Sequence, residues 1–375
     1  MTREARPAAC SLTRSLRLRC ALTCALLLLH ACSPPERPSS GAADSGGATP
    51  GMRVDLTGAG ATFPYPLYAR WFNEYAQETN VRVNYQSIGS GGGIRQVLAN
   101  TVDFGATDVP MSDADLERSR TPIIHVPMVL GAVGITYNLP EITRPLRLSG
   151  EVIAAVFLGT ITRWNDPRLV ALNPDATLPD RELLVVHRAD GSGTSYIFSD
   201  YLTAVSAAWA AGPGRGREVL FPVGIGGKGN EGVAGQVKQM PGSLGYLEVV
   251  YARQNRLPVA HIQNRAGRFV SPMPYEVASA ATSVVDAQSS AKDLRISLVN
   301  APGPQSYPIA SFTWLLIAPD AIGPRKTAQL VAFVRWALAD QNNAASTLGY
   351  VALPGSLADI VLDRLEQATT TPPRP

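Results

Sequence analysis

Apolar and polar residues follow two different spacings along this chain. Short runs of consecutive apolar residues, such as Leu183–Val186 and Phe312–Ile317, are typical of buried strands. Between such runs, apolar residues recur every three or four positions, as they do from Leu67 to Tyr75 and from Ile197 to Val205, which predicts helices with one buried face. Strands that alternate with helices predict an α/β fold with mostly parallel strand pairing.

Three of the predicted strand-to-helix junctions combine glycine with serine or threonine. They are Gly58–Pro64, Ile88–Gly93 and Arg188–Ser195, and Ser90 is a candidate N-cap of the second helix. A helix N-terminus exposes free N–H groups and a partial positive charge, and glycine lets a ligand approach the backbone closely. One such loop could equally be a capped turn, but three together predict a site for an oxyanion.

Ionisable residues follow two of the predicted strands. Arg188 would give the site a permanent fork of hydrogen-bond donors, and Asp190, two residues later, could brace it. Asp108 follows the predicted strand at 102–107, where it is either a turn or cap carboxylate or a part of the site. The residues by themselves leave these two interpretations of Asp108 open.

Other motifs exclude some kinds of site. The glycine-rich loop at 224–232 lacks the Gly-Lys-Ser/Thr ending of a P-loop, so we reject nucleotide binding by that device. Either Lys228 and its neighbours line the site, or this loop only begins a helix. His125, His187 and His261 are far apart in sequence and form no metal-binding pattern, so we expect no metal and no cofactor.

Length and charge change the picture in two ways. Of the 375 residues, roughly 315 remain without the leader and tails, which is too long for one typical core and predicts two lobes. Gly131-Ala132, between two apolar runs, suits a chain that crosses between lobes or a simple bend. The formal net charge of +3 includes five arginines and one glutamate in residues 1–31, so the remainder carries −1 and gives no case for binding nucleic acid.

Residues 1–31 have the features of a secretion signal. Arginines precede an apolar run that is too short to span a bilayer, and the run ends in Leu29-His30-Ala31-Cys32. That ending resembles the lipobox of bacterial lipoproteins, which implies lipidation of Cys32 and a membrane anchor in the cell envelope; an ordinary signal peptide cleaved nearby is the alternative. All four cysteines lie in residues 1–32, so we expect no disulfide in the body. Residues 32–52 read as a flexible tether and 369–375 as a disordered tail.

The motifs together resemble a known family, the phosphate-binding proteins of bacterial high-affinity phosphate ABC importers, from about residue 53 to 365. The matching stretches are Gly58–Pro64, Asn84–Gln86 with Gly89-Ser90, Thr101–Ala106, Arg188–Ser195 and Gly226–Asn230. The resemblance implies a type II periplasmic-binding-protein fold, in which two α/β lobes joined by a hinge hold the ligand in the cleft between them. It assigns 53–130 and 308–368 to lobe 1 and 131–307 to lobe 2, with hinges near 127–134 and 307–312.

The resemblance also implies a set of ligand-binding residues and a function. The phosphate contacts carried over by position are Thr62, Phe63 through its backbone N–H, Ser90, Asp108, Arg188, Ser192, Gly193 and Thr194. Asp190 occupies the position at which the family braces its arginine. We therefore expect a monomer that is not an enzyme, that closes around inorganic phosphate outside the cytoplasmic membrane, in the periplasm, and that delivers it to the membrane subunits of an ABC importer.

The implied role of Asp108 has a chemical rationale. Hydrogen phosphate and dihydrogen phosphate have an O–H group to donate to a carboxylate, whereas sulfate at neutral pH has none. A buried polar group left without its partner costs about 1–3 kcal/mol, and more when it is charged. An ionised Asp108 would therefore favour phosphate over sulfate.

Three alternatives remain open at this point. The site could bind another oxyanion, such as molybdate or sulfate, or the protein could act as a phosphate sensor. A serine hydrolase that uses Ser192 is the third, although Gly191-Ser192-Gly193 lacks the Gly-x-Ser-x-Gly motif and His187 need not face Ser192.

Overall fold

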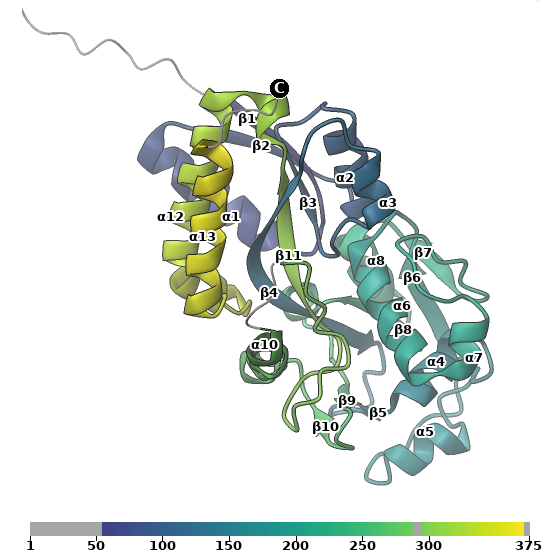
Figure 1. The fold of residues 1–375 in the computed structure, drawn as a ribbon. Helices are drawn as coiled ribbons and strands as arrows, with labels where there is room; N and C mark the ends of the chain where they lie inside the picture. Colours follow the sequence, from purple (N-terminus) through teal and green to yellow (C-terminus); the bar gives the residue numbers. More distant parts are fainter. Residues whose placement is uncertain (1–54, 289–293, 371–375) are drawn as a thin grey trace, which may run out of the picture. The chain divides into compact units, whose positions relative to one another are not determined.

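An eight-stranded sheet organises the fold in the computed structural model, which describes residues 55–288 and 294–370 (Figure 1). The strand order is β2-β1-β3-β11-β4-β8-β6-β7. The bounds are β1 Asp55–Gly60, β2 Arg82–Ser87, β3 Phe104–Thr107, β4 Ile124–Tyr137, β6 Leu184–Arg188, β7 Ile225–Gly227, β8 Ser243–Glu248 and β11 Ala310–Ile317. A second sheet has the order β10-β9-β5, from β5 Arg147–Leu148, β9 His261–Gln263 and β10 Phe269–Val270.

Strand pairing differs between the flanks and the centre of the large sheet. Strand β1 pairs in parallel with β2 and β3, and β6 pairs in parallel with β7 and β8. At the centre, β11 pairs antiparallel with β3 and β4, and β4 pairs antiparallel with β8. The α/β class is confirmed, whereas the expectation of mostly parallel pairing holds only at the flanks.

Strand β4 is continuous through Gly131-Ala132, where the sequence suggested a chain that crosses between lobes or a simple bend. Its residues up to Ala132 pair with β11, and its residues from Val133 pair with β8. Glycine does not break the strand here; it leaves room for a ring, because a Cβ on Gly131 would lie 2.5 Å from Cε1 of Phe63. We call β2, β1, β3, β11 and β4 up to Ala132 the first half, which comprises residues 55–132 and 310–370. The rest of β4 with β8, β6 and β7 belongs to the second half, which comprises residues 133–288 and 294–309.

Helices cover the sheet as the apolar spacing predicts. Helix α1 buries the expected face, which consists of Leu67, Tyr68, Trp71, Phe72 and Tyr75. The helix bounds are α1 Tyr65–Thr79, α2 Ser90–Leu98, α3 Asp113–Glu117, α4 Gly150–Phe157, α5 Pro167–Leu172, α6 Gly193–Val205, α7 Ala207–Ala211, α8 Gly229–Gln239, α9 Val249–Asn255, α10 Pro274–Gln288, α11 Pro319–Ile322, α12 Pro324–Leu348 and α13 Gly355–Thr370.

One hydrophobic core extends through both halves. It includes Trp71 and Phe104 of the first half, Phe157 and Trp164 of the second, and Leu130 of the shared strand β4. Such continuous packing gives the two halves a common core at β4.

Some predicted segments lie outside the described residues. These are the signal segment 1–31, Cys32 and the tether to residue 52. Helix α13 continues to Thr370, so it includes two residues assigned to the tail, and 371–375 are outside the description. Within the described ranges, no helix is long and apolar enough to cross a bilayer.

Candidate functional site

Loops from both halves converge on one buried cluster of polar side chains. Thr62 follows β1 and Asp108 follows β3 in the first half, whereas Arg188 ends β6 and Thr194 lies in the first turn of α6 in the second half. Each of these four residues is at most 4% exposed. The structure thus brings together residues that are up to 132 positions apart in the sequence, and a carboxylate and a guanidinium face one interior site.

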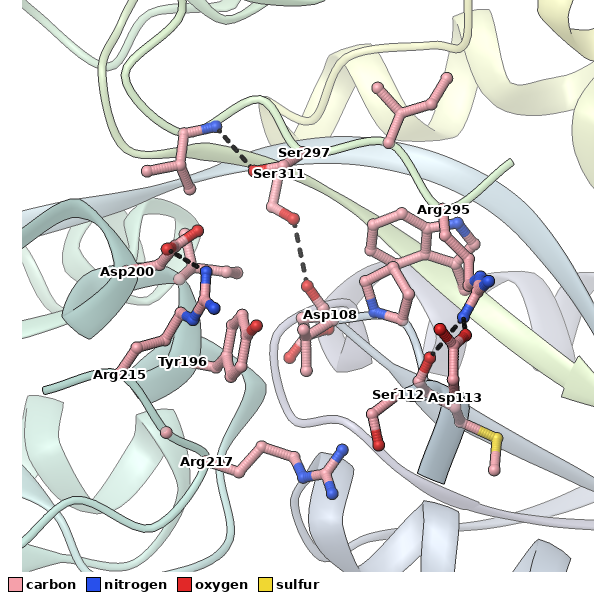
Figure 2. A pocket seen from close by; sticks show the side chains of 18 residues that line it. Asp108, Ser112, Asp113, Tyr196, Asp200, Arg215, Arg217, Arg295, Ser297 and Ser311 are labelled. Carbon is pink, nitrogen blue, oxygen red and sulfur yellow. Dashed lines mark hydrogen bonds and ion pairs between the residues drawn. The ribbon is translucent and has the colours of Figure 1, made fainter. Parts of the chain in front are cut away.

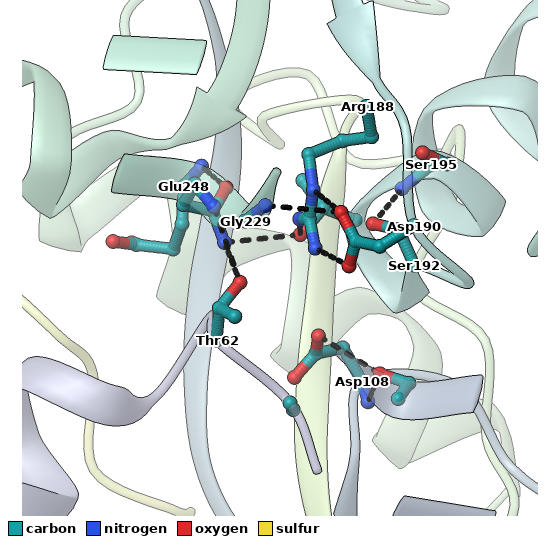
Figure 3. Close-up of polar contacts among 12 residues, drawn as sticks. Thr62, Asp108, Arg188, Asp190, Ser192, Ser195, Gly229 and Glu248 are labelled. Carbon is teal, nitrogen blue, oxygen red and sulfur yellow. Dashed lines mark hydrogen bonds and ion pairs between the residues drawn. The ribbon is translucent and has the colours of Figure 1, made fainter. Parts of the chain in front are cut away.

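Arg188 is held in place by its own strand-end loop (Figure 3). Its Nε and Nη2 donate to Oδ1 and Oδ2 of Asp190 at 2.8 and 2.5 Å, and its Nη1 donates to Oγ1 of Thr194 at 3.1 Å. Asp190 also accepts from the N–H of Gly229 at 3.0 Å. Burial by itself would raise the pKa of Asp190, but the bonds from Arg188 outweigh it and lower that pKa. Asp190 therefore stays ionised, and its two bonds give the guanidinium of Arg188 one fixed orientation, the bracing that the sequence suggests.

Asp108 is a buried carboxyl rather than a surface cap. Its Oδ1 accepts from the hydroxyl of Thr313 at 3.0 Å and its Oδ2 from the hydroxyl of Ser90 at 3.3 Å. Burial raises the pKa of Asp108 to about 7, although Thr313, Arg188 and Ser90 partly offset this. Above this pH the ionised carboxyl can only accept a hydrogen bond, from a ligand that carries a proton, and below it the protonated carboxyl can also donate.

Ser90 has a different local role from the one expected. The N-cap of α2 is Gly89, at a φ of 85°, and Ser90 is the first helical residue. Gly89 is required there because its φ is positive and a Cβ would lie 2.3 Å from Oδ2 of Asp190. The hydroxyl of Ser90 is therefore turned to Asp108, whose backbone N–H donates to it at 3.2 Å.

The remaining predicted contacts lie at the same place. Ser192 is buried and caps α6, since its Oγ accepts from the N–H of Ser195 at 3.0 Å. A Cβ on Gly193 would lie 2.4 Å from Oγ of Ser90, so the backbone approaches the site where no side chain fits. Phe63 is fully buried, and its carbonyl accepts from the hydroxyl of Tyr350 at 2.7 Å.

Two residues of the cluster were not selected from the sequence. Thr313 stands inside the apolar run of β11, where only its hydroxyl distinguishes it from its neighbours. Asn230 is fully buried near the start of α8, and its Nδ2 donates to Oγ1 of Thr62 at 2.7 Å. The glycine-rich loop before α8 pointed to Lys228 and its neighbours as possible site residues. Lys228 is exposed, however, and the buried polar residue is Asn230, two positions later.

The alternatives to a binding site receive no support from the geometry. The ring of His187 stacks on Phe221 at 4.5 Å between centroids, and its Nδ1 lies 2.9 Å from the carbonyl of Arg188. These contacts join His187 to Phe221 and its own strand, whereas the Oγ of Ser192 accepts from the N–H of Ser195 at the start of α6. Among the residues that the structure describes, no group of three or more His, Cys, Asp or Glu side chains could hold a metal ion.

The two halves touch directly around the site. The N–H of Gly91 donates to the carbonyl of Gly191 at 2.8 Å, and the hydroxyl of Tyr251 donates to the carbonyl of Thr62 at 2.6 Å. Beside the cluster is a cleft of about 650 Å³, shown in Figure 2, and Asp108 and Arg217 are among the residues that line it. Arg217 also forms an ion pair with Asp115 of the first half at 2.9 Å.

The cluster has a donor side and an acceptor side. On the donor side are the Arg188 guanidinium and hydroxyls of both halves, and on the acceptor side is the carboxyl of Asp108. An ion with several acceptor oxygens and one hydroxyl would match both sides. A fully deprotonated oxyanion would match the donor side alone, unless Asp108 were itself protonated.

Comparison with known proteins gives consistent matches. Residues 36–341 match the family model described as the PBP superfamily domain. The chain is 44% identical over 308 residues to the phosphate-binding protein PstS of Haemophilus influenzae, covering 82% of this chain and 90% of that protein. The PstS protein of Pasteurella multocida is 45% identical over 301 residues, covering 80% and 86%. The solved phosphate-binding protein from Stenotrophomonas maltophilia superposes with a TM-score of 0.63 at 19% identity, covering 83% of this chain and 93% of that one. These matches confirm the type II periplasmic-binding-protein fold.

Proposed function

Because the chain belongs to the PstS family of phosphate-binding proteins, we propose that it binds inorganic phosphate outside the cytoplasmic membrane and delivers it to an ABC importer. One observation carries the proposal beyond family membership. A braced, buried Arg188 faces a buried Asp108 whose pKa lies near 7, and buried hydroxyls surround both. Phosphate is an oxyanion that carries a proton at neutral pH, so it satisfies both poles of the site.

The ligand contacts follow from this arrangement. Thr62, Ser90, Ser192 and Thr194 supply hydroxyls, Phe63 and Gly193 supply backbone N–H groups, and Arg188 and Asp108 supply the two charged poles. Asp190 contributes through Arg188. At pH 8 Asp108, whose pKa burial raises to about 7, is mostly ionised and offers sulfate only lone pairs, so sulfate should bind more weakly than phosphate.

Titration calorimetry of purified residues 33–375 tests the proposed function directly. We expect phosphate to bind one site per chain and sulfate and molybdate to bind at least about 100-fold more weakly at pH 8. If sulfate or molybdate bound more tightly than phosphate, the protein would serve another oxyanion. If none of the three bound, the proposed function would be wrong.

We infer that ligand binding is coupled to closure of the two halves. Contacts come from both, so phosphate binds the closed arrangement more tightly than an open one and shifts the population towards it. The proposed hinges are the segments 127–134 and 307–312, which lie side by side where β4 and β11 pair. The closed form would then be the one that the importer recognises.

The ion pair between Arg217 and Asp115 is expected to stabilise that closed form. Arg217→Gln removes a pair whose side chains are 27% and 10% exposed, and keeps the backbone carbonyl that accepts from the N–H of Ser192 at 2.9 Å. Since a partly exposed pair contributes up to about 1 kcal/mol, phosphate affinity should fall about two- to fivefold, mainly through faster release. Stopped-flow release rates at several salt concentrations measure this.

A matched control lies two residues away. Arg215 lines the same cleft, but it pairs with Asp200 of its own half at 3.1 Å (Figure 2). Arg215→Gln should leave the release rate unchanged. Equal effects of the two substitutions would argue against a role for Arg217 in closure and point to a general effect of cleft charge.

We also propose that Cys32 carries a lipid anchor and that the protein is a monomer in the periplasm. The Leu29–Cys32 sequence and the absence of other cysteines beyond residue 32 support the first part. Mass spectrometry of the protein produced in a bacterium should find acyl groups on Cys32, and Cys32→Ala should release it from membranes. A mature N-terminus elsewhere, without acyl groups, would contradict the anchor.

A further inference from the structure

Two threonine hydroxyls from opposite halves meet one amide side chain. The Nδ2 of Asn230 donates to Oγ1 of Thr62 at 2.7 Å and to Oγ1 of Thr194 at 3.3 Å. All three side chains are buried, with exposures of 2% or less. Water therefore does not compete for these hydrogen bonds. The neighbouring groups decide which member of each pair donates and which accepts.

The oxygen of each hydroxyl already accepts two hydrogen bonds. Oγ1 of Thr62 also accepts from the backbone N–H of Asn230 at 3.3 Å, and Oγ1 of Thr194 also accepts from Nη1 of Arg188 at 3.1 Å. A hydroxyl has two acceptor lone pairs and one hydrogen, so the lone pairs of both are used. In the described part of the chain neither hydrogen has an acceptor, so both are available to a ligand.

The orientation of the Asn230 amide is itself fixed. Its Oδ1 accepts from the backbone N–H of Glu248 at 2.9 Å, at the end of β8 (Figure 3 shows Glu248 beside Thr62). A flipped amide would place Nδ2 against that N–H, with two donors facing each other. The amide N–H groups therefore point at the threonines, and the threonines cannot donate to Asn230.

We propose that Asn230 is a positioning residue that makes Thr62 and Thr194 obligatory hydrogen-bond donors to the bound anion. This inference rests on the proposed function, since it concerns the same binding site. The role of Asn230 complements that of Asp108: the donor side presents only hydrogens, so the hydroxyl hydrogen of phosphate finds no acceptor there and is directed to Asp108. The two residues together fix the orientation of the ion.

Replacing Asn230 with aspartate, which has almost the same shape, reverses the direction of its hydrogen bonds to the two threonines. Asn230→Asp keeps an acceptor for the N–H of Glu248 but offers the two threonines an acceptor, to which they would donate instead of to phosphate. We expect phosphate affinity at pH 8 to fall at least about 100-fold. Asn230→Ala, which frees the hydroxyls without opposing them, should lower it about tenfold.

Lowering the pH distinguishes a positioning role of Asn230 from a purely structural one, which would not change the affinity ratio with pH. Protonated aspartate can donate again, so the ratio of Asn230→Asp to native dissociation constants should shrink as pH falls from 8 to 5. A double-mutant cycle tests whether Asn230 acts through the hydroxyl of Thr62. In a Thr62→Val background, Asn230→Ala should lower phosphate affinity by clearly less than it does alone. Calorimetry on the folded variants measures all of these constants.

Asn173 is the matched control. It is a buried asparagine, 5% exposed, whose amide bonds the backbone of Arg147 and Leu169 away from the site. Asn173→Ala should lower the melting temperature and leave phosphate affinity unchanged. Additive effects of the Thr62 and Asn230 substitutions, or a constant affinity ratio across pH, would overturn the role of Asn230. Failure of the native protein to bind phosphate would instead overturn the proposed function.

Discussion

Arg188→Ala is expected to lower phosphate affinity on the order of 10³-fold while the fold survives. The guanidinium is buried and its Nη1 faces the site beside Thr194, so truncation removes charge-assisted hydrogen bonds that water cannot replace. It also leaves the Asp190 carboxylate, which is braced by the same guanidinium, as an unpaired negative charge near the anion. Truncating one partner of a buried charged pair costs about 2–5 kcal/mol, which corresponds to a loss of this size.

Two further variants sharpen this experiment. Arg188→Lys keeps the charge but cannot donate to both oxygens of Asp190 and to Thr194, so its affinity should lie between those of Arg188→Ala and the native protein. The control is Arg168→Ala, because Arg168 also bonds both oxygens of an aspartate two residues away, at 3.0 and 2.9 Å, but on the surface. Calorimetric titration should find native affinity for that control. Near-native affinity of Arg188→Ala would move the anion site elsewhere.

Asp108→Asn is expected to abolish the discrimination between phosphate and sulfate. Asparagine can turn a donor toward the ligand, so sulfate no longer meets a carboxylate that has only lone pairs to offer, and phosphate loses the acceptor for its hydroxyl. We expect the phosphate-to-sulfate affinity ratio at pH 8 to fall at least about 100-fold. Competition of the two ions in calorimetry gives this ratio. Asp113→Asn, at a carboxylate that lines the same cleft but is 83% exposed, should leave it unchanged.

The same carboxyl predicts a pH dependence of selectivity in the native protein. Burial raises the pKa of Asp108 to about 7, so the group is an acceptor above that pH and a donor below it. Sulfate fits only the protonated form, and its binding should therefore weaken about tenfold for each pH unit above 7 and level off below it. In Asp108→Asn this slope should disappear. A sulfate affinity that did not change between pH 6 and pH 9 in the native protein would contradict the assignment.

Most residues of the buried cluster could be selected from the sequence because they lie in short, distinctive segments. Glycine-rich strand-to-helix junctions located Thr62, Ser90 and the 188–195 loop, and local spacing paired Arg188 with Asp190. The contacts of Thr313 depend on register instead. Its hydroxyl reaches Asp108 only because β11 lies beside β3, a pairing across more than 200 positions that no local pattern encodes.

Two other features could not be read from local patterns for related reasons. Gly131-Ala132 was interpreted as a crossing between lobes or a bend, and β4 does change its pairing partner there, but the need for a small residue comes from the ring of Phe63, 68 positions earlier in the chain. Asn230 was not singled out, because the glycine-rich loop pointed only to Lys228 and its neighbours or to the start of a helix. Its role arises from tertiary contacts with Thr62, Thr194 and the N–H of Glu248.

The unbroken strand β4 also bears on how the molecule denatures. Because one 14-residue strand is a member of both halves and one core continues across it, neither half can melt without stripping a neighbouring strand from the other. We expect differential scanning calorimetry to record a single endotherm whose van't Hoff and calorimetric enthalpies agree. Phosphate should then displace the whole peak to higher temperature, rather than splitting it into one ligand-sensitive and one ligand-insensitive component.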